Sequence, residues 1–139
     1  MQTKYQFIGV ATVVVALAVY FNVGYFSYDD ANLLLSKNFA KFSKLKTVFL
    51  ACPEVSYVNQ AGEIRDLQML STHSLSPAQL SQFKTLLQEV QCVGISRDDS
   101  STIFILKSQG RQCIVFDDKK HPSGDRVNQL KENWYFVER

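Results

Sequence analysis

The sequence that determines the fold is SPAQLSQFKTLLQEVQCVGISRDDSSTIFILKSQGRQCIVF, residues 76–116, in which one helical pattern precedes three β-rich runs. Ser76 is placed to be the N-cap of the helix and Pro77 its first residue, and Gln79 completes a capping box. Apolar residues then recur at helical spacing, which predicts an amphipathic helix over residues 77–91. Its inner face consists of Leu80, Phe83, Leu86, Leu87 and Val90.

Three β-rich runs follow this helix, at residues 93–96, 102–107 and 112–116. The spacers between them are made of turn-forming residues and have lengths that β-hairpins prefer. This pattern predicts a three-stranded antiparallel meander. The second and third runs are apolar on both faces, so they are central strands, or they cover a helix on one side and present a contact surface on the other.

The preceding residues predict one further helix and a hairpin. Asp29 or Asp30 can cap an amphipathic helix of about 20 residues that ends before Pro53. Residues 55–59 and 63–70 then predict a β-hairpin, although the second stretch is also compatible with a helix.

The last part of the chain completes an α+β domain at residues 29–139. We expect a short helix at residues 123–132 and a final strand at residues 134–137. Amphipathic helices packed on an antiparallel sheet are the predicted architecture. One core is expected to contain Leu80, Phe83, Leu87, Ile103, Ile105 and Val115.

An apolar run precedes this domain. No charged residue occurs between Lys4 and Asp29, and 16 of the 20 residues from 7 to 26 are hydrophobic. Twenty helical residues measure about 30 Å, the thickness of the hydrocarbon core of a bilayer. The rest of the chain is too short to bury such a helix on all sides. The run therefore predicts a transmembrane helix, with residues 1–28 as an N-terminal membrane anchor.

Two alternatives remain for this anchor: whether it is cleaved, and on which side of the membrane the domain lies. Lys4, residues 7–15 and the Ala-Leu-Ala sequence at 16–18 also fit a signal peptide cleaved after Ala18. The lysines that follow the run, counted by the positive-inside rule, place the domain in the cytoplasm. We favour a periplasmic domain, because the positive charge of the short N-terminal tail lies closest to the run and Asp29 is the first charge on the other side.

The composition excludes several classes of protein. The net charge of +2 argues against a nucleic-acid binder. Three cysteines and two histidines are too few for a disulfide scaffold or a zinc module. We predict no cofactor and no metal site, because the chain carries no nucleotide-binding, zinc-hydrolase or dithiol redox motif.

Several polar residues could be combined into a hydrolytic site, but no nucleophile-elbow motif accompanies them. They are His73, Asp117, Asp118, His121, Ser123 and Asp125. Residues 121–125 are turn-forming types, so a turn is the favoured interpretation. The acidic pairs at 98–99 and 117–118 lack the spacing of a calcium loop and are interpreted as polar strand ends.

Two groups of residues are candidates for intermolecular contact. A lysine group lies on one side of the first predicted helix and could contact anionic lipid headgroups, unless it is simply solvated. An aromatic group near the C-terminus has side chains favoured at protein interfaces, unless these pack in the core. The lysine group is Lys37, Lys41 and Lys44, and the aromatic group is Trp134, Tyr135 and Phe136.

The predicted strand order limits which cysteines can form a disulfide. The first and third strands of a meander lie about 9–10 Å apart, whereas a disulfide needs Cα atoms within about 7 Å. Cys92 and Cys113 should therefore not pair, unless Cys92 lies off the plane of the sheet. An exported domain would instead pair Cys52 with one of them, and a cytoplasmic domain would keep all three reduced.

Features of the second half of the chain carry a resemblance. They are the helix opening at Ser76-Pro77, Cys92 with residues 95–98, the strand at 103–106, Ser-Gln-Gly at 108–110, and the closing sequence at 133–139. Together they resemble small membrane- or lipid-anchored bacterial proteins of unknown function. The resemblance implies a location in the bacterial envelope and carries no activity with it.

These observations predict a single-pass protein of the bacterial inner membrane whose small domain binds another protein and is not an enzyme. The alternatives are a structural or lipid-contacting subunit of a membrane complex, and an enzyme of unrecognised type.

Overall fold

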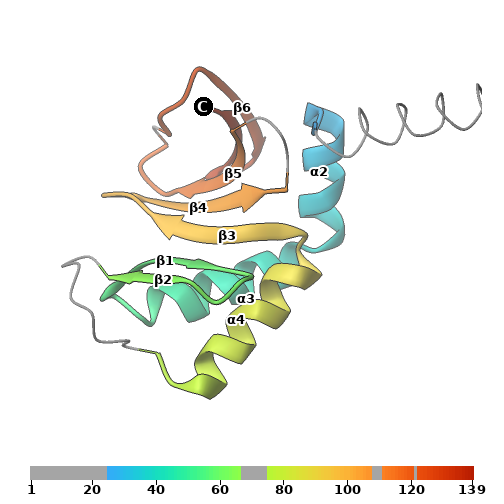
Figure 1. Cartoon of the computed structure of the whole chain (residues 1–139). Helices are drawn as coiled ribbons and strands as arrows, with labels where there is room; N and C mark the ends of the chain where they lie inside the picture. The colour runs from blue at the N-terminus through green and yellow to red at the C-terminus, as the bar shows by residue number, and fades with distance from the viewer. Residues whose placement is uncertain (1–24, 67–74, 108–110, 121) are drawn as a thin grey trace, which may run out of the picture.

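The computed structural model describes residues 25–66, 75–107, 111–120 and 122–139, which form an α+β domain (Figure 1). Within these residues three helices pack against one antiparallel sheet, which confirms the predicted fold class. The helices are α2 (Tyr28–Lys37), α3 (Phe39–Leu50) and α4 (Pro77–Glu89).

The sheet has seven strands in the order β2-β1-β3-β4-β5-β7-β6, and all neighbours are antiparallel. The predicted meander is β3-β4-β5, and the predicted hairpin is β1-β2. Residues 67–70, the end of the second predicted hairpin strand, lie outside the described residues. The strands are β1 (Val55–Asn59), β2 (Ile64–Asp66), β3 (Cys92–Arg97), β4 (Ser101–Leu106), β5 (Gln112–Asp117), β6 (Arg126–Lys131) and β7 (Trp134–Glu138).

Helix α4 begins as the sequence predicts. The Ser76 hydroxyl accepts a hydrogen bond from the Gln79 N–H at 3.2 Å, and the Gln79 side chain accepts one from the Ser76 N–H at 2.9 Å. This capping box satisfies two of the N–H groups that the first helical turn leaves unpaired.

The single first helix that the sequence predicted is wrong, because the chain forms two helices that meet at Asn38. The Leu34 carbonyl accepts hydrogen bonds from both the side chain of Asn38 at 3.0 Å and its backbone N–H at 3.2 Å, and α2 ends there. The N-cap is Ser27 rather than Asp29 or Asp30, and Asp30 is its capping-box partner. The break lets α2 contact β6 and β7 while α3 lies beside α4.

The helix predicted for residues 123–132 is also wrong, because these residues contain strand β6. The good helix formers in this stretch are overridden by pairing with β7, whose residues Val137 and Phe136 lie opposite Val127 and Asn128. Gly124 leads into the strand where any Cβ would collide with Val137, so the approach of the chain to β7 requires glycine.

The two faces of the sheet carry separate apolar clusters, so the expectation of one shared core is wrong. Phe83 and Leu87 of α4 lie in the cluster between the helices and the sheet, and Leu80 packs against it. Ile103 and Val115 lie in a second cluster made only of strand residues, against which Ile105 packs. Successive strand residues point to opposite faces, so Phe104 reaches the helices and its neighbours cannot.

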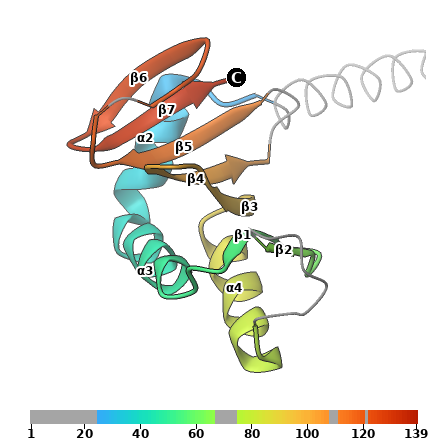
Figure 2. The same ribbon diagram turned by 90° about the vertical axis from the view of Figure 1, so that its left-hand side faces the viewer.

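The helix-facing cluster includes an aromatic group around Trp134. The indole ring lies 5.7 Å from Phe39 and 6.2 Å from Phe42, both on α3, measured between ring centroids. It lies 5.6 Å from Phe104 on β4 and 5.2 Å from Phe116 on β5. The contacts join α3 to the half of the sheet formed by β4, β5 and β7 (Figure 2).

No helix among the described residues is long and apolar enough to cross a membrane. The apolar run at residues 7–26 falls outside the described part of the chain, apart from Tyr25 and Phe26.

We expect Phe83→Ala to lower the free energy of unfolding of the full chain in detergent by about 3–5 kcal/mol, since it opens a cavity in the helix-facing cluster. Phe83 is 0% exposed and contacts Phe49 edge to face. Denaturant unfolding measures the change. Gln82→Ala on the exposed side of α4 is the control and should change stability by less than about 0.5 kcal/mol. Equal stabilities of the two variants would contradict the packing of α4.

Candidate functional site

The Gln112 side chain binds the backbone of Phe26, the last residue of the apolar run, and we call this contact the Gln112 clamp. This side chain is 1% exposed, and it accepts a hydrogen bond from the Phe26 N–H at 2.8 Å and donates one to the Phe26 carbonyl at 2.6 Å. The buried amide of Gln112 thus pairs with both the N–H and the C=O of Phe26, as a residue of a neighbouring strand would. The end of the apolar run is therefore held against β5 without an intervening linker.

A second contact fixes the start of α2. The Tyr28 hydroxyl donates to the Gln129 carbonyl of β6 at 2.9 Å. Together with the clamp, it attaches residues 26–28 to two strands that lie near the other end of the sequence.

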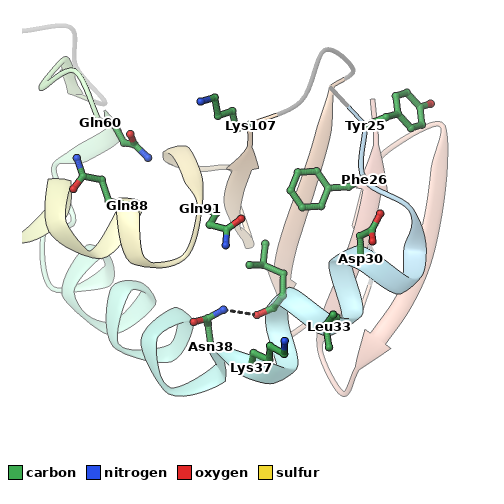
Figure 3. Close-up of a pocket in the computed structure, with 11 residues that line it drawn as sticks. Tyr25, Phe26, Asp30, Leu33, Lys37, Asn38, Gln60, Gln88, Gln91 and Lys107 are labelled. Carbon is green, nitrogen blue, oxygen red and sulfur yellow. Dashed lines mark hydrogen bonds between the residues drawn. The ribbon is translucent and has the colours of Figure 1, made fainter. Parts of the chain in front are cut away.

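The entering segment also forms one side of a groove of about 720 Å³ (Figure 3). Helix α2 supplies this side, and the opposite side comes from the C-terminal end of α4, the residue after β1 and the end of β4. Phe26 lies between the two sides in the close-up. The described lining residues are Tyr25, Phe26, Asp30, Leu33, Leu34, Lys37, Asn38, Gln60, Gln88, Gln91 and Lys107.

Side-chain amides dominate the wall opposite α2. Gln60 donates to the Cys92 carbonyl at 2.6 Å, which leaves the oxygen of its amide to accept. Gln88 and Gln91 are exposed at the end of α4. Each amide group can donate and accept, so the wall matches a ligand that does both.

Charge in the groove comes from two lysines and one carboxylate. Lys37 and Lys107 are exposed, and neither makes an ion pair with another described residue. Hydrogen bonds from the backbone and side chain of Ser27 lower the pKa of Asp30, whose carboxylate thus serves the N-terminus of α2. The groove therefore offers two cations and one carboxylate that already has partners.

Gln91 occupies a strained position in this wall. Its φ of 57° lies in the left-handed region, at the residue after the C-cap of α4, where glycine is the common choice. A residue with a Cβ costs about 1 kcal/mol more than glycine there. The chain instead places an exposed amide side chain at the groove.

The predicted lysine group is divided by the helix break. Lys37 ends α2 and lines the groove, whereas Lys41 and Lys44 lie on α3. All three are exposed, but the continuous helix face assumed from the sequence does not exist. The neighbouring Lys46 packs instead over the Phe116 ring, 3.6 Å from its centroid, and burial lowers the pKa of this lysine.

The predicted aromatic group is buried rather than available to a partner. Trp134 and Phe136 are 3% and 2% exposed and lie in the helix-facing cluster. Tyr135 is 8% exposed and lies in the cluster on the other face. The alternating directions of a central strand place all three in the interior.

The polar residues considered for hydrolysis do not form a site in the described structure. His73 and His121 lie outside the described residues. Asp117 is fully buried and accepts hydrogen bonds from the Ser101 hydroxyl at 3.0 Å and the Lys119 N–H at 2.9 Å. The described part of the chain holds no cluster of three or more side chains suited to a metal ion.

All three cysteines are free thiols. Cys92 and Cys113 belong to clusters on opposite faces of the sheet, and burial raises the pKa of both thiols. The bridge from Cys52 that we expected for an exported domain is not formed.

The chain matches no protein-family model, no curated protein and no solved structure. Inferences about its function therefore rest on the geometry described above.

Sequence reasoning identified Lys37 as a contact residue but missed the glutamines of the groove and the clamp. Glutamines belong to no chemical motif, and the position of Gln112 at the start of a predicted strand indicated only pairing. Gln91 was predicted to be the last residue of a helix, so the sequence did not mark its left-handed backbone.

We expect Gln112→Leu to cost about 1–3 kcal/mol of stability, because it leaves the N–H and C=O of Phe26 without partners. Hydrogen exchange at the Phe26 amide should become faster. The control is Gln129→Leu, the same substitution at an exposed position of β6. Unchanged protection of Phe26 in the Gln112 variant would show that the clamp does not hold the segment.

Gln91→Gly should stabilise the full chain by about 0.5–1 kcal/mol, because glycine adopts the left-handed conformation without strain. Gln88→Gly, three residues earlier in the last turn of α4, should have the opposite sign and cost about 1 kcal/mol. Thermal unfolding of both variants tests the pair. A loss of stability in the Gln91 variant would mean that this side chain contributes more than its backbone strain costs.

Proposed function

We propose that this chain is a single-pass membrane-anchored protein whose domain binds another protein at the membrane surface and catalyses no reaction. The proposed anchor is the predicted transmembrane helix, and it ends before Phe26 and Tyr28, which are bound to β5 and β6. The observation that carries the proposal is the position of the groove, which includes Tyr25 and Phe26, the last two residues of the apolar run. A partner in or on the same membrane could reach a groove in this position.

The Gln112 clamp supports a binding role. A domain joined to its anchor by a flexible linker would lose orientational freedom when a partner binds. Here the end of the run is hydrogen-bonded to β5 at 2.8 and 2.6 Å, so much of that freedom is already lost. The groove therefore keeps a fixed position relative to Phe26, the last residue of the apolar run.

The composition of the groove favours binding over catalysis. Its described lining contains no histidine, cysteine or serine, and its carboxylate, Asp30, already serves as a helix cap. Nucleophilic or general acid-base catalysis needs a reactive group beside a second group that activates it. Amides over an apolar base are suited to recognition instead.

Lipid contact is a second candidate function, favoured by exposed side chains near the apolar run. Tyr25, Tyr28 and Leu33 are 61%, 41% and 53% exposed. Tyrosines are enriched where a protein meets the membrane interface. We favour a protein partner because the amide wall pairs more fully with a polypeptide than with a lipid headgroup.

The proposed location is the bacterial inner membrane with the domain in the periplasm. This location rests on the charges that flank the apolar run and on the resemblance of the C-terminal half to anchored envelope proteins. The three free thiols favour a cytoplasmic domain instead.

Photocrosslinking in native membranes tests the partner. A benzophenone amino acid in place of Leu33, at the groove, should give one discrete adduct of constant mass. The same residue in place of Leu50 is the matched control, because this helical leucine is 48% exposed and lies outside the groove. No adduct at Leu33, or equal adducts at both positions, would refute the proposed binding site.

Alkaline extraction of the same membranes tests the anchor. An uncleaved transmembrane helix keeps the chain in the membrane pellet. Release into the supernatant, or a mature protein that begins at Val19, would refute the anchor.

A further inference from the structure

The groove carries its two cations at opposite ends. Figure 3 shows Lys107 at the end near Tyr25 and Lys37 at the other end, beside Asn38. Asp30 lies on the α2 side and has its carboxylate on the Ser27 N–H at 3.0 Å. An occupant that runs along the groove therefore meets a free ammonium group at each end.

The wall between these lysines suits a polypeptide backbone. Gln60, Gln88 and Gln91 project from it, and their amide groups contain both donors and acceptors. A peptide backbone presents N–H and C=O groups in alternation, so it can use both halves of such a wall. A phosphate group only accepts hydrogen bonds and would leave the amide oxygens unpaired.

The base of the groove provides an apolar contact. The Phe26 ring points between the two sides in Figure 3, and Leu33 and Leu34 of α2 also line the groove. In an extended peptide, successive side chains point in opposite directions, so an apolar side chain can face this base while its neighbours face the rim.

We propose that the occupant of the groove is an extended acidic peptide segment of the partner protein, with one carboxylate near Lys37 and another near Lys107. The inference rests on the proposed function and specifies the chemistry of the partner. The distance between the two lysines sets the number of residues that separate the two acidic residues of the partner along the extended segment.

The test uses the full chain in phosphatidylcholine nanodiscs and a set of capped peptides of about seven residues, in which two glutamates are separated by about two to five positions. Each has a matched peptide with glutamine at both positions. Side-chain amide resonances of Gln88 and Gln91 report binding. At least one acidic peptide should shift them saturably, with an affinity about fivefold or more above that of its glutamine peptide, as expected for two exposed ion pairs. The difference should shrink as salt increases.

Two double variants of equal charge identify the site. Lys37→Gln with Lys107→Gln should remove the preference for the acidic peptide. Lys41→Gln with Lys44→Gln, on exposed positions of α3, should leave it intact. Equal loss in both variants would mean that net charge alone attracts the peptide and would overturn the proposal.

Other outcomes separate this inference from the proposed function. If no peptide of the set binds while the Leu33 adduct forms, the chain binds a partner of different chemistry and the acidic segment is wrong. If the resonances shift only when the nanodiscs contain phosphatidylglycerol, the groove binds a lipid headgroup and the acidic segment is again wrong. If the Leu33 adduct is absent, the proposed function itself fails.

Discussion

The contact of Trp134 with four phenylalanine rings is the interaction on which the described structure depends. Two of these rings, Phe39 and Phe42, come from α3 near the start of the domain, while Trp134 lies on β7 near its end. Aromatic rings bury large areas and prefer such edge-to-face geometry. The contact therefore joins the two ends of the domain, and neither the helices nor the outer strands can bury their apolar faces alone.

The position of the groove follows from this contact between α3 and β7. Helix α2 can run alongside β6 and β7 because α3 is fixed on the sheet directly after Asn38, and the segment before α2 then meets β5. Gln112 and Phe26, far apart in the sequence, form their two hydrogen bonds at that point. A residue of the central sheet thus binds Phe26, the last residue of the apolar run.

The chain accepts a local cost at the groove. Gln91 keeps a left-handed backbone that glycine would adopt more easily, and the position gives the groove an exposed amide. Elsewhere in the domain most residues suit the structure that they adopt, as the helix caps, the strand residues and the buried aromatic rings do. Lys120 and Asn133 adopt the same left-handed backbone outside the groove, so this conformation is not confined to the groove.

The sequence by itself determined the elements whose local signals agree with the fold. Capping chemistry set the start of α4, and apolar runs set the strands of the meander, because these signals act over a few residues. Tertiary structure decided the rest. Residues 126–131 form a strand because β7 offers a partner, the first helix breaks at Asn38, and Trp134 and its neighbours enter the interior because their strand is flanked by two others. The groove depends on residues from 25 to 107 that only the folded chain brings together, since glutamine has no spacing rule that marks a binding site in a sequence.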